Sequence, residues 1–223
     1  MDGNGRWAQR RGLKRTDGHA AGEEALFDTI EGARDIDLRW MTVYAFSTEN
    51  WRRPLDEVRF LMHFNESILL RRREELDRMG VRVRFIGRRG GRVPKRLVAR
   101  IEETEALTAK NRKLTLTFAF NYGGRAELTD AVRLIAAEVA AGKLDARKVD
   151  EKTISRHLYA PDMPDPDLLV RTSGEYRISN YLLWQVAYAE LVFTDVLWPD
   201  FRTKDLVAAI AEYQRRDRRF GAI

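Results

Sequence analysis

The chain has 223 residues, 44% of them hydrophobic and 33% charged, a composition typical of one globular domain with a full core. It contains no cysteine, which excludes disulfides, thiolate zinc sites and a cysteine nucleophile, and it shows no signal peptide and no apolar run as long as a membrane span, which is consistent with a cytoplasmic protein. The net charge of +6 favours anionic partners such as nucleic acid, an anionic lipid surface or phosphorylated small molecules.

The first segment, Met1–Trp7 (MDGNGRW), places an acid, two glycines and an arginine close together. Glycines let the backbone approach a ligand with exposed N–H groups, and arginine donors suit phosphate oxygens. A carboxylate beside an anion site needs a cation between the two charges, so Asp2 indicates a magnesium–phosphate site. The alternative is an ordinary surface turn. Such a Gly-rich turn normally follows a strand, which we expect ahead of Met1, so that the chain looks truncated.

Strand-like and helix-like segments alternate along the rest of the chain, which favours a parallel sheet covered by helices. Helices are predicted at 18–36, 54–79, 94–110, 125–142, 152–159 and 204–219, and strands at 38–46, 81–86, 114–120, 167–170 and 191–196. No linker or repeat divides the chain. We therefore predict an α/β fold, a single domain over residues 1–223 with a mostly parallel central sheet of about six strands and helices on both faces.

The helix predicted at 54–79 is apolar on more than one side. One helical stripe contains Val58, Leu61 and Leu69, whereas Phe60 and Phe64 lie on a different side. This pattern indicates either a helix buried between two layers or a helix that packs on the sheet and also lines a hydrophobic cavity. The second possibility applies if the substrate has a long apolar tail.

Polar segments follow three of the predicted strands. These segments are Ser47–Arg53, Asn121–Arg125 and Arg171–Asn180. Because ligands bind outside the carboxyl ends of strands in open parallel sheets, we expect the three segments to converge with the opening turn on one site.

The segment after the fourth strand contains two arginines and a serine within nine residues. Arg171, Arg177 and Ser179 could surround one diphosphate, because guanidiniums and hydroxyls bind phosphate oxygens. The alternative is an exposed loop whose arginines form weak surface pairs. His19 could reach a phosphate from the start of a helix or could simply cap that helix.

Several other functions are disfavoured. The basic residues alternate with acidic ones along the helices, and the best nucleic-acid candidate, Arg88–Arg92, is better interpreted as a loop, so no nucleic-acid partner is expected. His63 and His157 are interpreted as structural, and no zinc pattern is present. The glycine spacings match neither nucleotide-binding motif.

Seven motifs run through nearly the whole chain: MDGNGRWA at 1–8, GH at 18–19, YAFSTENWRRP at 44–54, NYGGR at 121–125, RTSGEYRISNYLLWQVAYAEL at 171–191, TDVLWPDF at 194–201 and RRFG at 218–221. In this order they resemble the cis-prenyltransferase family. The Asp-rich D-D-x-x-D segments of the unrelated trans-prenyltransferases are missing from the sequence. Tyr176 stands where some relatives have histidine, which puts a secondary contact in doubt.

The resemblance implies a magnesium-dependent homodimeric enzyme that adds isopentenyl diphosphate units to an allylic primer such as farnesyl diphosphate. The new double bonds are cis, and a long product serves as the lipid-carrier precursor for cell-wall synthesis. The helix at 54–79 would then line a hydrophobic tunnel for the growing chain. The lipid product implies transient association with the inner face of the membrane.

The resemblance also implies roles for single residues. Asp2 is the essential acid that positions magnesium, and Glu190 assists magnesium or the second substrate. The allylic diphosphate is bound by Gly3, Asn4, Gly5, Arg6, Trp7 and Arg15, with His19 nearby. A mobile segment closing over the site contains Ser47, Thr48, Glu49, Asn50, Trp51 and Arg53, of which Asn50 is a catalytic candidate. Arg171, Arg177 and Ser179 bind isopentenyl diphosphate, and Arg219-Phe220-Gly221 resembles an ending that reaches the neighbouring subunit.

Two alternatives to a long-chain synthase are considered. One is a short-chain synthase that stops after one or a few additions, because the side chains at the tunnel floor cannot be placed from the sequence. The other is a non-catalytic partner subunit, which should have lost Asp2 and the diphosphate-binding residues. These residues are all present, which disfavours a non-catalytic subunit.

Overall fold

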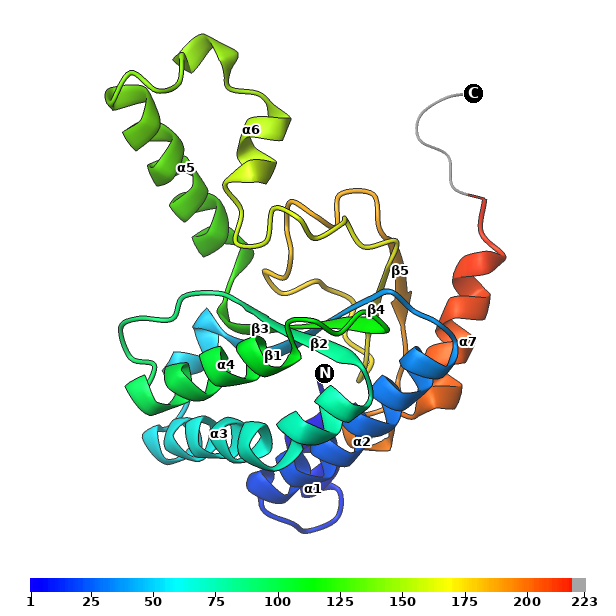
Figure 1. Ribbon diagram of the computed structural model, residues 1–223. Coiled ribbons are helices and arrows are strands. Elements are labelled where there is room, and N and C mark those ends of the chain that lie inside the picture. The colour runs from blue at the N-terminus through cyan, green and yellow to red at the C-terminus, as the bar shows by residue number, and fades with distance from the viewer. Residues whose placement is uncertain (218–223) are drawn as a thin grey trace.

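The structure is a computed structural model that describes residues 1–217. Two small parallel sheets form the centre of the fold (Figure 1). The larger sheet has the strand order β1-β3-β2, and the smaller sheet pairs β4 with β5. The strands are β1 (Trp40–Ser47), β2 (Val81–Ile86), β3 (Leu114–Tyr122), β4 (Leu168–Arg171) and β5 (Glu190–Phe193). The α/β class and the parallel strands are confirmed.

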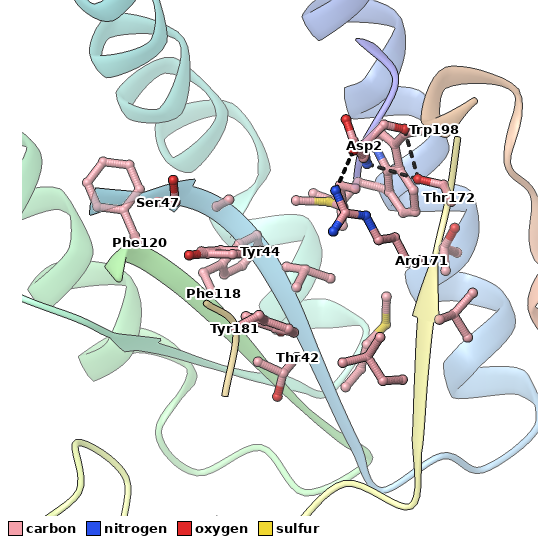
Figure 2. Close-up of a pocket in the computed structure, with 18 of the residues that line it drawn as sticks. Asp2, Thr42, Tyr44, Ser47, Phe118, Phe120, Arg171, Thr172, Tyr181 and Trp198 are labelled. Carbon is pink, nitrogen blue, oxygen red and sulfur yellow. Dashed lines mark hydrogen bonds and ion pairs between the residues drawn. The ribbon is translucent and has the colours of Figure 1, made fainter. Parts of the chain in front are cut away.

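The prediction of one central sheet of about six strands is wrong for the described residues, which form five strands in two sheets. β1 and β4 each pair on one side only, so the two sheets do not join. The two strands flank a cavity instead (Figure 2). The strand expected ahead of Met1 stays a prediction.

Seven α-helices and three 3₁₀ segments complete the described part of the chain. The α-helices are α1 (Asn4–Gln9), α2 (Arg15–Asp35), α3 (Leu55–Arg78), α4 (Lys95–Thr108), α5 (Gly124–Ala140), α6 (Glu151–Arg156) and α7 (Thr203–Gln214). The 3₁₀ segments are η1 (Thr48–Arg52), η2 (Ala146–Lys148) and η3 (Trp198–Asp200). Within residues 1–217, no helix has the length and apolar character needed to cross a membrane.

The two faces of the larger sheet are covered differently. On one face, Leu116 and Val83 pack in the main core with α2 and α3, and Leu97 of α4 packs in a second cluster under Phe46 and Phe120. On the other face, Ala119 and Tyr122 meet Ala160 and Leu182, which lie in irregular chain. The prediction of helices on both faces is therefore wrong, because loop segments cover the second face and α5 and α6 project away from the body (Figure 1).

α1 is a short helix that the sequence did not predict. Gly3 precedes it with a left-handed φ of 107°, so a glycine turn leads directly into a helix instead of forming a surface loop. α1 packs closely on α2 because Gly18 and Gly22 of α2 have no side chain. A Cβ on Gly18 would lie 2.1 Å from the carbonyl oxygen of Asn4.

Candidate active site

A cavity of about 1240 Å³ lies between the two sheets and α3. Its volume exceeds the range of ordinary small-molecule pockets. Its polar mouth lies at the carboxyl ends of β1 and β4, and its inner part is apolar (Figure 2). The apolar lining includes Leu61, Phe64, Ile68, Leu97, Ile101, Phe118 and Phe120. Phe60 stacks on Phe64 with ring centroids 5.5 Å apart, so the second apolar side of α3 faces this region.

The backbone of Asp2 is tied to the exit of β4. Its amide N–H donates to Oγ1 of Thr172 (2.9 Å), the Thr172 hydroxyl donates to the Asp2 carbonyl (2.8 Å), and the Trp198 amide donates to the same carbonyl (2.9 Å). These contacts hold the position of Asp2 without using its side chain. Figure 2 shows Asp2 beside Arg171, Thr172 and Trp198.

The Asp2 carboxylate points to the mouth of the cavity and is 42% exposed. Oδ1 accepts from the Gly3 amide at 2.7 Å, and Oδ2 accepts from Nη2 of Arg171 at 3.0 Å. Burial by itself would raise the pKa of Asp2, but the Arg171 guanidinium and the Gly3 amide together lower it below its ordinary value. The carboxylate is therefore ionised at neutral pH.

Arg171 is the central residue of the loop that is predicted to bind isopentenyl diphosphate. Its guanidinium donates to Oγ of Ser179 (2.7 Å) and to the Arg177 carbonyl, and its Nε is buried without a hydrogen-bond partner among the described residues. Arg171 therefore contacts the Ser179 hydroxyl and the Arg177 backbone, whereas the Arg177 guanidinium pairs with Glu175. The shared diphosphate site stays a prediction.

Arg6 reaches the same loop from α1. Its guanidinium donates to the carbonyl of Ser173 at 3.0 Å and lies 3.3 Å from Oε1 of Glu175 and 3.8 Å from Oδ2 of Asp2. Glu175 also pairs with Arg177. The sequence interpretation missed Glu175, since only the folded loop shows that one carboxylate serves two of the arginines.

A second basic cluster surrounds Glu57, in the first turn of α3. Oε1 of Glu57 lies 3.0 Å from Arg53, 3.4 Å from Arg15 and 4.0 Å from Nε2 of His19. Gly5 permits the approach of Arg15, because a Cβ there would lie 3.0 Å from its guanidinium carbon. Glu57 was not predicted as a site residue, although its spacing of four from Arg53 is a helical ion-pair spacing.

His19 is a neutral imidazole in this cluster. Burial lowers its pKa to about 4, and the positive charge of Arg53 acts in the same direction, while Glu57 opposes it. Its Nε2 is buried and has no hydrogen-bond partner within the described chain. A neutral ring with a free nitrogen in the cavity lining can donate one hydrogen bond to an incoming phosphate.

The segment from Ser47 to Arg53 closes one side of the mouth. Oδ1 of Asn50 accepts from the Ser47 amide (3.1 Å), which fixes the turn of η1, and Glu49 accepts from Nδ2 of Asn180 (2.7 Å). The indole N–H of Trp51 donates to Oδ1 of Asn121 at 2.7 Å.

Most of the predicted site residues line the cavity together. These are Asp2, Gly3, Asn4, Gly5, Arg6, Arg15, His19, Ser47, Glu49, Asn50, Arg53, Arg171, Arg177 and Ser179. Trp7, Thr48, Trp51 and Glu190 are not part of the lining. The indole of Trp7 donates to Asp200 (2.7 Å) instead, and Trp51 points to Asn121.

Glu190 is separated from Asp2 in this chain. It begins β5 opposite Leu168, whereas Arg171, which contacts Asp2, lies three residues further along β4. That spacing amounts to about 10 Å along a strand. Oε2 of Glu190 accepts from Arg216 at 2.8 Å. A role for Glu190 in metal binding stays a prediction, and Arg219-Phe220-Gly221 lies outside the described residues.

The donor set suits magnesium bound jointly with a phosphate. Among residues 1–217, no group of three histidine or carboxylate side chains could hold a metal alone. Mg²⁺ commonly uses one or two carboxylates and completes its shell with waters and substrate phosphates. The half-exposed, ionised Asp2 beside the arginines fits that pattern.

Comparison with known proteins places these motifs in one family. Residues 1–221 match the sequence model of the family described as "Putative undecaprenyl diphosphate synthase". A trans,polycis-polyprenyl diphosphate synthase ((2Z,6E)-farnesyl diphosphate specific) from Thermobifida fusca is 57% identical over 221 residues, which cover 99% of this chain and 78% of the relative. Decaprenyl diphosphate synthase from Mycobacterium tuberculosis is 51% identical over 222 residues, covering 100% of this chain and 75% of the relative.

A solved structure agrees with the fold over its full length. Lavandulyl diphosphate synthase from Lavandula x intermedia, in complex with dimethylallyl diphosphate, superposes with a TM-score of 0.96 at 36% sequence identity. The match covers 100% of this chain and 95% of that chain.

Proposed function

The chain belongs to the undecaprenyl diphosphate synthase family, and on that premise we propose that it condenses isopentenyl diphosphate repeatedly onto an allylic diphosphate, farnesyl diphosphate in particular, to make a long-chain Z-polyprenyl diphosphate. One observation carries the proposal. Two arginine clusters, around Glu57 and around Arg171, flank Asp2 at the mouth of a cavity whose inner wall is apolar. Two diphosphates and one apolar chain require this combination.

The arginines would stabilise the charge that develops as the reaction begins. The allylic C–O bond breaks, and negative charge builds on the departing diphosphate. Arg15 and Arg53 lie beside Glu57, and Arg6 reaches the cavity from α1 near Asp2 and Glu175. All three line the cavity, where they can bind that diphosphate. Arg171, Arg177 and Ser179 would hold isopentenyl diphosphate. Its terminal alkene carbon then bonds to the allylic carbon, and a proton leaves its C2.

Magnesium would be held by Asp2 together with diphosphate oxygens. When bound, the ion would neutralise part of the diphosphate charge. Asn50, Ser47 or a diphosphate oxygen could accept the proton, and these alternatives stay open. Closure of the segment after Ser47 would exclude water from the allylic cation.

The growing chain would occupy the apolar part of the cavity, which we propose as the hydrophobic tunnel. The aromatic pair Phe85 and Phe118, stacked at 5.1 Å between centroids, forms part of its wall. The named products of the relatives support a long chain, and the large cavity volume agrees with it.

Sizing of the products tests this function. Purified protein with Mg²⁺, farnesyl diphosphate and labelled isopentenyl diphosphate should give long-chain products, and chelation of the metal should abolish them. Products of only one or a few condensations would instead support the short-chain alternative. No product, with Asp2→Ala behaving like the wild type, would support the non-catalytic subunit.

We also propose a homodimer that associates with the membrane surface when loaded with product, and a role in supplying the lipid carrier for cell-wall synthesis. Support for the dimer comes from α5, which projects from the body (Figure 1). Its side chains Val132 and Leu134 are exposed. A cytoplasmic location is consistent with the phosphorylated substrates.

A further inference from the structure

η1 carries two cavity-lining residues, Glu49 and Asn50. Its largest side chain is Trp51, which points away from the cavity. The Trp51 ring packs edge-on against Phe46 (4.9 Å between centroids), and the Arg92 guanidinium lies 4.6 Å from its centre. Trp51 is therefore one anchor of η1, beside the hydrogen bonds that Asn50 and Glu49 form with Ser47 and Asn180.

Asn121 is the residue that holds Trp51 by its polar atom. Oδ1 of Asn121 accepts from the indole N–H at 2.7 Å, and Nδ2 donates to the Arg88 carbonyl at 2.8 Å. The backbone continues the connection, since the Arg88 amide donates to the Asn121 carbonyl at 3.3 Å. One side chain thus links η1 to the end of β3 and to the loop after β2.

Three observations indicate that Asn121 serves this link and not the ligand itself. It is 7% exposed and does not line the cavity. Its carboxamide is used at both ends. Its backbone has a left-handed φ of 48° at the point where the register between β1 and β3 shifts, a conformation that asparagine tolerates better than most residues.

We propose that Asn121 is a positioning residue for prenyl transfer: through Trp51 it fixes η1 in the arrangement that presents Asn50 and the adjacent Arg53 to the allylic diphosphate. This inference rests on the proposed function. Without the link, η1 would visit other positions, and the apparent affinity would fall by the fraction of molecules that remain competent. Substrate at saturation would restore the competent arrangement, so KM should change more than kcat.

The experiment uses Asn121→Gly, which removes the carboxamide and keeps a residue that accepts the left-handed backbone. We expect the KM for farnesyl diphosphate to rise about tenfold, equivalent to about 1.4 kcal/mol, with kcat within about threefold of the wild type. Trp51→Phe removes the donor from the same hydrogen bond and should raise the same KM. The double variant should show little further increase, because both changes break one link.

Asn111→Ala is the matched control. The Asn111 carboxamide also bridges backbone, donating to Val81 (3.0 Å) and to the Asp77 side chain (2.9 Å), but at the opposite end of the sheet. This variant should lower the melting temperature without changing the KM. Trp51→Phe keeps the test decisive if Asn121→Gly does not fold.

Three results would overturn the proposal: a KM within twofold of the wild type in both single variants, independent multiplicative effects in the double variant, or an equal KM change in Asn111→Ala. Product formation by the wild type tests the proposed function separately. The same ratios can be measured as dissociation constants for farnesyl diphosphate by calorimetry, which needs no turnover.

Discussion

The side chain of Asp2 can be changed without loosening the segment that carries it. Its amide and carbonyl hold Thr172 and Trp198, while the carboxylate remains 42% exposed beside Arg171. At the scale of a single residue, the backbone atoms of Asp2 therefore fix its position, and its carboxylate carries its chemical role.

We expect Asp2→Ala to fold normally and to lose activity by orders of magnitude. The carboxylate is the group suited to magnesium at the cavity mouth, and its loss also leaves Arg171 without its anionic partner. Turnover with farnesyl and isopentenyl diphosphates, together with thermal unfolding, measures both effects. Asp2→Asn is the control that keeps the shape and removes the charge, and it should be nearly as inactive. More than about a tenth of wild-type activity, a barrier change under roughly 1.4 kcal/mol, would contradict the role of Asp2.

His19 should make the stability of the fold depend on pH. Burial lowers its pKa to about 4 from 6.5 in the unfolded chain, so between these values the unfolded state binds more protons than the folded state. Stability due to His19 is therefore complete above pH 6.5 and is lost as the pH falls towards 4. The full difference corresponds to about 3 kcal/mol.

Denaturant unfolding of wild type and His19→Gln at pH 7 and pH 4.5 measures this dependence. The variant cannot titrate at this position, so its stability should fall less between the two pH values than that of the wild type. Equal losses in both proteins would show that the imidazole is not held neutral.

At the scale of elements, two glycines of α2, Gly18 and Gly22, let α1 lie close to α2 and so position the residues of α1 that are expected to bind the allylic diphosphate. A Cβ on Gly18 would lie 2.1 Å from the Asn4 carbonyl, and one on Gly22 would lie 2.4 Å from the Asn4 side chain. α1 carries Asn4 and Arg6 into the cavity wall, so its distance from α2 sets their position.

Gly18→Ala should therefore destabilise the protein and weaken substrate binding together. The added methyl group has to displace the backbone of α1, which costs roughly 1–3 kcal/mol of stability. The displacement of α1 also moves Arg6. Gly90→Ala is the matched control, because no atom lies within 4 Å of a Cβ there and its φ is not left-handed. Chemical denaturation and the KM for farnesyl diphosphate should change only in Gly18→Ala, and identical behaviour of the two variants would contradict the close-approach argument.

The sequence predicted elements best where apolar periodicity is long. The strands expected at 81–86 and 114–120 and the helix expected at 54–79 correspond closely to β2, β3 and α3. β3 is buried at nearly every position, and its large apolar residues Leu114, Leu116, Phe118 and Phe120 lie at every second position. α1 was missed because six residues starting after a glycine contain no periodic stripe.

The sequence predicted the side chains that would bind phosphate in the candidate site, but not the side chains that hold them in place. Arg171, Arg177 and Ser179 stand close in the chain, so local spacing brings them together. Glu57 and Asn121 act through contacts across 42 and 70 residues of chain, to Arg15 and Trp51 respectively. Only the packing of α3 against α2 and of β3 beside η1 places them there.

At the scale of the whole molecule, α5 and α6 leave the body as one projecting unit (Figure 1). α5 buries Glu127, Ala131 and Ile135, which recur every four residues on one side. Val132 and Leu134, which lie outside that buried row, are 59% and 54% exposed. Exposed apolar side chains on a projecting helix suit a partner, and we propose that a copy of the same chain covers them symmetrically.

Val132→Lys should therefore convert the proposed dimer to a monomer while leaving the fold intact. A charge in the centre of an apolar contact would be buried without a partner, whereas on a free surface it would cost little. Light scattering coupled to size exclusion over a range of concentrations measures the mass, and circular dichroism monitors the fold. Val207→Lys, on exposed α7, is the control for adding one lysine at an accessible apolar site, since Val207 is 42% exposed. A wild type that is monomeric at all concentrations would contradict the proposed dimer. A Val132→Lys variant that remains dimeric would show that the dimer contact does not include this side of α5.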